Sequence, residues 1–270
     1  MTKRLTLLSA LGTSIALAMI AALMSIAPSV GAQSFVSLDD LEAGDLIRGE
    51  SYSAVYYYGE DGFRYVFPND KTYFTWYDNF DDVVWLTDGD LSDVQIGGNV
   101  TYKPGVKMIK INSDPTVYVI ANGGELRGIP SEEVAEELYG SNWNTQIDDV
   151  PDGFFSNYTL GSELEFASQF DPASEEAGAW NIGSDKDLQS YTLITISDNG
   201  YDDGASVAPG TAIRFYNAGS DKHTASADDG SWGTGTLNSG EHFSRYFDED
   251  DELDFHDAYD SNLSGSINLE

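Results

Sequence analysis

The sequence predicts a mainly β protein with minor α: two small β-hairpin-plus-helix repeat units followed by a Greek-key β-sandwich. Three observations support this prediction. A pattern of aromatic, glycine and proline residues occurs twice within residues 47–164, at a spacing of 62 residues. Residues 165–187 are rich in Ala, Ser, Glu, Asp and Gly without an apolar period, which is typical of a linker. From Ser190 onward, short alternating apolar and polar runs are separated by turn residues, as in a sandwich.

The N-terminus has the composition of a secretory signal peptide. Lys3 and Arg4 precede an apolar stretch from Leu5 to Ala27, and the small residues Val30–Ala32 follow it. We therefore expect residues 1–32 to be removed and the protein to be secreted, extracellular or part of the cell envelope. The apolar stretch is also long enough to span a membrane, so a retained anchor is the alternative. No second run of this length occurs, and we expect no membrane span after signal cleavage.

The composition narrows the range of partners and cofactors. The chain has 46 acidic and 13 basic residues, a net charge of −33 that falls to −35 without Lys3 and Arg4. Such a charge repels nucleic acid and anionic lipid. It suits a solvated surface in high salt, or recruitment of Ca²⁺ between neighbouring molecules, although Ca²⁺ needs several converging oxygen ligands. The chain has no cysteine, which excludes disulfides, thiolate metal ligands and cysteine nucleophiles.

Two related units are expected at 47–105 and 106–164, after an N-terminal segment at 33–46. Each has a β-rich run, a glycine turn and a second run ending at a proline, which predicts a hairpin. A serine-capped helix from Ser131 to Gly140 follows the second hairpin. We expect the units to pack on one another, because neither could bury much core alone. The recurring residues are Val55, Tyr56, Gly62, Phe67, Pro68 and Tyr77, matched by Val117, Tyr118, Gly124, Ile129, Pro130 and Tyr139.

The units resemble uncharacterised repeats of the form V-Y-x5-G-x-x-R-x-(F/I)-P in exported bacterial envelope proteins. Arg127 fits this form in the second unit, whereas Arg64 lies one position early in the first. The resemblance implies an extracellular location and no known reaction. The large aromatic side chains of the units are expected in the core, with a glycan-binding platform as the alternative, because aromatic rings also stack on apolar faces. These residues are Tyr56, Trp76, Trp85 and Trp143.

Residues 188–270 resemble a plastocyanin-type cupredoxin domain. Apolar and polar residues alternate at 191–196, 212–216, 243–247 and 265–269, and turn residues separate these runs. Landmarks of the family occur between them in the expected order. These landmarks are Val207–Thr211, Phe215–Asn217, His223–Thr224, Asp229–Ser231, Gly235–Gly240, Phe243, Phe247 and Gly265–Ile267. The resemblance implies a Greek-key sandwich and draws attention to the family's copper site.

The sequence departs from the family at that copper site. A blue-copper centre uses two imidazoles, one thiolate and usually a weak axial thioether. His223 matches the first histidine of the family. In the last loop, usually C-x-x-H-x-x-M-x-G, the three ligand positions hold Asp257, Asp260 and, at the axial position, Leu263. We therefore expect the blue-copper site to be lost, with His223 as a structural residue. The alternative is a harder site for Cu²⁺, Zn²⁺ or Mn²⁺ built from His223, Asp257 and Asp260.

The remaining motifs do not indicate an enzyme. The three histidines, His223, His242 and His256, all lie in the last domain, and no G-x-S-x-G, H-E-x-x-H or G-x-x-x-x-G-K-[ST] motif occurs. We expect a secreted or cell-surface, non-enzymatic protein without a cofactor that is structural, self-associating or adhesive. Its expected partners are itself, other envelope proteins or cell-wall glycans. The alternative function is a metal-binding cupredoxin-type module linked to electron transfer or metal handling.

Overall fold

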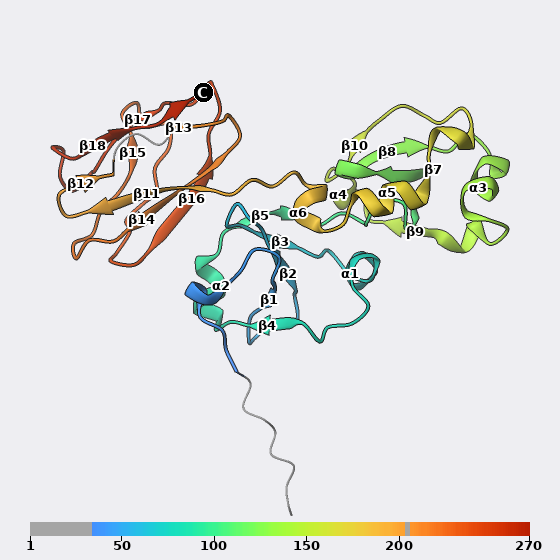
Figure 1. Ribbon diagram of the computed structural model, residues 1–270, viewed down its shortest axis with the longest axis horizontal. Helices are drawn as coiled ribbons and strands as arrows, with labels where there is room; N and C mark the ends of the chain where they lie inside the picture. Colours follow the sequence, from blue (N-terminus) through green and yellow to red (C-terminus); the bar gives the residue numbers. More distant parts are fainter. Residues whose placement is uncertain (1–33, 203–205) are drawn as a thin grey trace, which may run out of the picture. The chain divides into compact units, whose positions relative to one another are not determined.

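The computed structural model describes residues 34–202 and 206–270, and the predicted signal peptide lies outside the described residues. Strands in five sheets dominate the described chain, and its helices are short (Figure 1). The predicted fold class, mainly β with minor α, is therefore confirmed. Within 34–202 and 206–270, no helix has the length and apolar character needed to cross a membrane.

The first sheet is built around a tyrosine-rich hairpin. Its strand order is β4-β1-β2-β3-β5, and β4 and β5 run parallel to β1 and β3, respectively. The antiparallel hairpin of β2 and β3 turns at Gly62, whose φ of 79° favours glycine. The elements are β1 (Leu46–Arg48), β2 (Tyr56–Tyr58), β3 (Arg64–Val66), α1 (Asp70–Trp76), β4 (Val83–Trp85), α2 (Asp88–Asp93) and β5 (Ile96–Asn99), preceded by the 3-10 helix η1 (Leu38–Asp40).

The second sheet has the same strand order and the same pairing directions as the first. Its order is β9-β6-β7-β8-β10, with antiparallel β6, β7 and β8 and parallel partners at both edges. The two units are joined by a side-chain hydrogen bond, in which the amide of Asn99 donates to the amide oxygen of Asn157 at 3.1 Å. The elements are β6 (Met108–Ile111), β7 (Asp114–Ala121), η2 (Asn122–Gly124), β8 (Glu125–Gly128), α3 (Glu132–Tyr139), η3 (Trp143–Gln146), β9 (Ile147–Val150), α4 (Asp152–Phe155) and β10 (Thr159–Leu160).

The segment 165–187, expected to be a linker, contains short helices and contributes to two cores. Phe170 packs in the core of the second sheet and Ile182 in that of the first. Asp171 and Asn181 cap two of the helices by accepting backbone N–H groups. The apolar residues of this segment occur singly between capped turns and form no helical or strand period. The sequence pattern therefore predicts a linker and not these helices. The helices are η4 (Ala167–Gln169), α5 (Pro172–Gly178) and α6 (Ile182–Asp185).

The remaining strands form the C-terminal sandwich. A four-stranded sheet of order β12-β11-β14-β16 faces the smaller sheets β13-β19 and β15-β17-β18. Phe215, Phe247 and Phe255 are buried between them, with Trp232 packed against all three. The strands are β11 (Thr192–Ser197), β12 (Gly200–Tyr201), β13 (Ser206–Val207), β14 (Ala212–Asn217), β15 (Ser226–Ala227), β16 (His242–Tyr246), β17 (Asp254–His256), β18 (Ser264–Ser266) and β19 (Asn268–Leu269).

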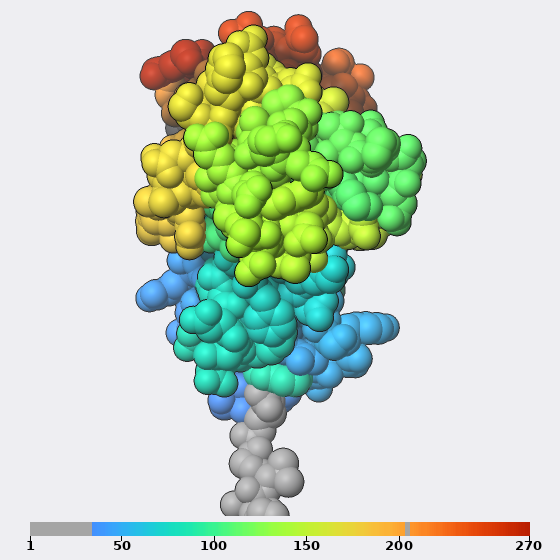
Figure 2. Space-filling view, turned by 90° about the vertical axis from the view of Figure 1, so that its right-hand side faces the viewer, coloured from blue at the N-terminus to red at the C-terminus, as the bar shows by residue number. Residues whose placement is uncertain are grey.

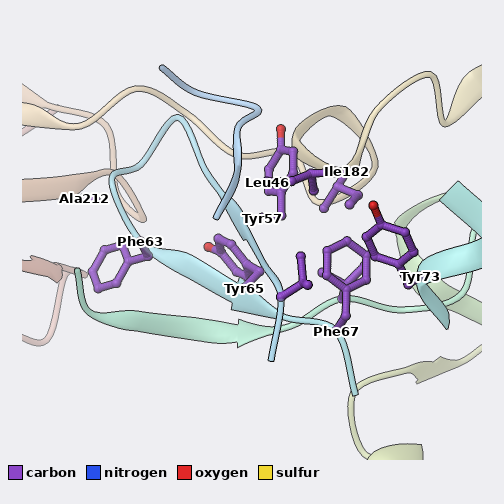
Figure 3. Packing of buried hydrophobic residues seen from close by; sticks show 10 residues of the cluster. Leu46, Tyr57, Phe63, Tyr65, Phe67, Tyr73, Ile182 and Ala212 are labelled. Carbon is purple, nitrogen blue, oxygen red and sulfur yellow. The ribbon is translucent and has the colours of Figure 1, made fainter. Parts of the chain in front are cut away.

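The first hairpin packs against strand β16 of the sandwich. Figure 3 shows the apolar cluster that includes Ala212 beside Phe63 and Tyr65. The carboxylate of Asp61 is fully buried and accepts hydrogen bonds from the hydroxyls of Tyr65, at 2.5 Å, and Tyr246. Two further hydrogen bonds join the side-chain amide of Gln95 to the backbone of Ser244 in β16. These contacts cover the free edge of β16, which would otherwise be open to pairing with another strand.

Candidate functional site: a buried histidine between two carboxylates

The fold brings His223 and Asp257 together although 34 residues separate them in sequence. His223 follows β14, and its backbone pairs with Leu237 through two hydrogen bonds of 3.0 and 2.8 Å. The side chain of Asn217, at the end of β14, donates to the backbone oxygen of Leu237 at 2.8 Å and fixes this loop. Asp257 directly follows β17, and its backbone N–H donates to the oxygen of Leu263 at 3.0 Å.

The two side chains form a short, buried contact. Nδ1 of His223 lies 2.6 Å from Oδ2 of Asp257, and the two residues are 4% and 0% exposed. The second oxygen of Asp257 accepts the backbone N–H groups of Thr224 and Tyr259, at 3.1 and 3.0 Å. It also accepts the hydroxyl of Thr224 at 3.3 Å. A buried carboxylate is stable only with such partners, and Asp257 has them on both oxygens.

The other ring nitrogen of His223 faces a second carboxylate. Nε2 lies 3.3 Å from Oδ1 of Asp198, in the turn that follows β11. Asp198 also accepts the backbone N–H groups of Ser220 and Asp221 and the hydroxyl of Ser220. Only a doubly protonated imidazole can donate from both nitrogens, so this arrangement favours the charged form of His223.

The pKa shifts agree with this charge state. Burial lowers the pKa of His223, but its hydrogen bonds to Asp257 and Asp198 and the charges of both outweigh burial and raise it above 6.5. Burial raises the pKa of Asp257, but hydrogen bonds from His223 and from the N–H groups of Tyr259 and Thr224 lower it below its usual value. Both shifts favour the ionised pair.

The other two candidate ligand positions lie apart from this pair. Asp260 is exposed, and its carboxylate accepts the backbone and side-chain N–H groups of Asn262 within its own turn. Leu263 is half-buried and contributes backbone hydrogen bonds to the loop. His256 pairs instead with Asp228, Nδ1 to Oδ1 at 2.7 Å. His223 and Asp257 are thus brought together, whereas Asp260 forms a separate turn.

The arrangement does not provide the ligands of a blue-copper centre. The chain has no thiolate, and Leu263 has no donor atom. Two ligands held about 2.0–2.2 Å from one tetrahedral metal stand more than about 3 Å apart. The 2.6 Å separation of His223 and Asp257 is that of a direct hydrogen bond. Among the residues that the structure describes, no group of three or more His, Asp and Glu side chains is placed to hold a metal ion.

Asp198 is the member of the site that the sequence analysis missed. It lies in the Asp-Asn-Gly turn at 198–200, whose composition indicates a turn and nothing more. Its role depends on the loop after β14 folding back on the end of β11, a contact that no local pattern indicates. The sequence shows β11 and β14 only as two successive β-rich runs. That they pair in parallel, which brings the turn after β11 near the loop after β14, is seen only in the structure.

The sequence matches no protein-family model and no curated protein. Among solved structures, the chain is similar to a purple cupredoxin from Nitrosopumilus maritimus, with 17% identity and a TM-score of 0.26. That similarity covers 29% of this chain and 99% of the cupredoxin. A copper(I) form of an amicyanin variant is similar at 16% identity and a TM-score of 0.27, over 30% of this chain and 82% of amicyanin.

Proposed function

We propose that this chain is a secreted or cell-surface, non-enzymatic protein whose cupredoxin-like sandwich is a structural module and not an electron carrier. The observation that carries the proposal is the 2.6 Å contact between His223 and Asp257. In the resemblance to cupredoxins, these positions hold the first histidine and the cysteine of the copper centre. By this resemblance, a hydrogen-bonded ion pair takes the place of two copper ligands.

The physical argument concerns what each group can do. Electron transfer through a blue-copper site depends on a soft thiolate, and a carboxylate does not replace it. A buried ion pair with complete hydrogen bonding instead joins β17 to the loop after β14. Breaking such a pair leaves an uncompensated buried charge, which costs about 3–5 kcal/mol. The site therefore has a structural use that needs no cofactor.

The surface role is supported by other parts of the chain. The predicted signal peptide at 1–32 and the net charge of −33 suit an exported protein. The polar and aromatic contacts around Asp61 join the first hairpin to the sandwich, which suits a protein that transmits or resists force between its parts. We propose itself, other envelope proteins or cell-wall glycans as its partners.

Metal analysis tests the structural role of the sandwich. The protein is produced in cells supplied with copper and zinc, purified without chelators and analysed for both metals beside the His223→Ala variant. We expect far less than one equivalent of metal in both proteins. One equivalent of copper or zinc in the native protein that is absent from His223→Ala would contradict the proposal and support a metal-binding module.

Labelling of intact cells tests the surface role. Antibody against the sandwich, applied to unbroken cells and to the culture medium, should detect the protein outside the cytoplasm. Sedimentation of the purified protein with and without Ca²⁺ then measures self-association. Detection in the cytoplasm alone would contradict the proposed location.

A further inference from the structure

Each five-stranded unit has a hollow at the same place in its fold. The hollow of the first unit has a volume of approximately 420 Å³ and that of the second approximately 390 Å³. Seven of the ten residues that line the first hollow have counterparts 62 residues later in the lining of the second. Val55 corresponds to Val117 and Phe67 to Ile129. Each hollow is therefore enclosed by the equivalent hairpin and helix of its own unit. Both volumes lie within the usual range for small-ligand sites.

An aromatic ring lines each hollow. In the first unit, Phe80 is 48% exposed and stacks on Tyr73, with 4.3 Å between ring centroids. Phe74 lies outside the lining of the hollow, is 49% exposed and meets Phe80 edge to face at 5.3 Å. In the second unit, the ring of half-buried Trp143 lines the hollow where position 135 is alanine and not tyrosine. The clustered exposed rings of the first unit indicate a contact surface.

Both hollows have an acidic rim. Asp70 and Glu132 are counterparts, begin α1 and α3, and are exposed. The neighbouring polar side chains Asn69 and Ser131 already accept the backbone N–H groups of their helices. Oδ1 of Asp70 accepts the backbone N–H of Lys71 at 3.0 Å, so Oδ2 of Asp70 and the carboxylate of Glu132 are the rim oxygens that can accept from a ligand. These oxygens, with a net charge of −33 on the whole chain, exclude anionic ligands.

We propose that these two hollows bind a neutral polysaccharide of hexose or N-acetylhexosamine units. A pyranose ring has an apolar C–H face that can stack on Phe80 or Trp143, and hydroxyl groups that can donate to Asp70 or Glu132. Two equivalent sites suit a polymer with a repeating unit, because a second contact on the same polymer raises the overall affinity. Figure 2 shows the cyan chain around α1 and the yellow-green chain around α3 on the same face.

A glycan would be a partner for the surface protein proposed above. Glycan binding rests on that proposed function only for its biological setting. Binding by purified protein is independent of cellular location and of any metal in the sandwich. A failure of one proposal is therefore distinguishable from a failure of the other. A basic peptide would also suit an acidic rim, but one carboxylate in the first hollow and two in the second, each beside an aromatic ring, favour a ligand with many hydroxyl groups and no charge.

Calorimetric titration of the purified full-length protein tests the proposal. The probes are cellohexaose, chitohexaose and mannohexaose as neutral glycans, an oligogalacturonate as an anionic glycan, and hexalysine as a basic peptide. We expect at least one neutral hexasaccharide to bind and the anionic glycan not to bind. Phe80→Ala and Trp143→Ala should each weaken binding about tenfold, as expected for removal of an aromatic anchor.

Three further variants control for misfolding. Trp180→Ala removes an aromatic side chain that is 73% exposed and lines neither hollow, and it should bind like the native protein. The Asp70→Asn and Glu132→Gln variants change only exposed rim residues and should each weaken binding. They keep the proposal testable if Trp143→Ala unfolds the second unit. Three results would overturn the proposal: no binding of any neutral glycan, unchanged binding in the combined Phe80→Ala and Glu132→Gln variant, or binding of hexalysine in place of glycan.

Discussion

His223 and His242 lie in the same sandwich, but their surroundings favour opposite charge states. His223 has a carboxylate on each ring nitrogen, and its pKa is raised. His242, at the start of β16, is half-buried beside the positive charge of Arg214. Burial and, to a lesser extent, Arg214 lower its pKa to about 4. The comparison teaches that burial beside a positive charge neutralises a histidine, whereas hydrogen-bonded carboxylates within the same fold outweigh burial and keep it charged.

Removal of Asp257 should break this comparison with the largest effect. Asp257→Ala leaves His223 without its closest partner and removes the acceptor for the N–H groups of Thr224 and Tyr259. We expect the free energy of unfolding to fall by about 3–5 kcal/mol, measured by chemical denaturation. Asp260→Ala is the matched control, because that carboxylate is exposed, and it should cost less than about 1 kcal/mol. Equal losses in both variants would contradict the account.

The pH dependence of stability should differ between the two histidines. The contribution of His223 is fully present below its ordinary pKa of about 6.5 and is lost as pH rises through its raised pKa. His242 acts in the opposite direction: stability falls as pH drops from about 6.5 to about 4, because the unfolded chain takes up a proton that the folded chain does not. Ring-proton NMR should give a midpoint above 6.5 for His223 and near 4 for His242. Titration midpoints near 6.5 for both histidines would contradict the predicted difference between their environments.

A smaller change should result from removing the charge near His242. In Arg214→Gln, the pKa of His242 should rise from about 4 but stay below 6.5, because burial is its main cause. Arg245→Gln is the matched control. Arg245 lies on β16, as His242 does, and its side chain pairs with Asp251. It should leave the titration of His242 unchanged. A shift in the control as large as that in Arg214→Gln would show that the local charge assignment is wrong.

The smallest effect is expected at Asp198. Its carboxylate is partly exposed and lies farther from the ring of His223 than that of Asp257, at 3.3 against 2.6 Å. Asp198→Asn should lower the pKa of His223 but leave it above the value found in Asp257→Ala. The same NMR titration measures both variants. A larger drop in Asp198→Asn would reverse the order of the two partners.

Some of these features could be predicted from the sequence because they depend on local patterns. Alternating residues and glycine turns predict a mainly β chain, and the described strands confirm that class. The positions of His223 and Asp257 were singled out by resemblance, and the structure places them in contact. The helices within 165–187 were not predicted, because isolated residues such as Phe170 and Ile182 produce no period.

Other features depend on contacts between distant segments. The hydroxyl of Tyr246 donates to Asp61 across 185 residues of sequence, and no local signal indicates that partner. Asp198 reaches His223 in the same way, through the pairing of β11 with β14. The equivalence of the two hollows is encoded by the 62-residue spacing, but only folded coordinates show that Asp70 and Glu132 lie at a hollow.

The central claim, that His223 and Asp257 form an ion pair in place of a metal centre, is tested most directly by nitrogen NMR of the His223 ring. The spectrum is recorded at pH 6.5 before and after one equivalent of Zn²⁺. The account predicts that both ring nitrogens are protonated and that their shifts do not change on addition of Zn²⁺. An unprotonated Nδ1 that shifts with Zn²⁺ in the native protein, but not in Asp257→Ala, would contradict it.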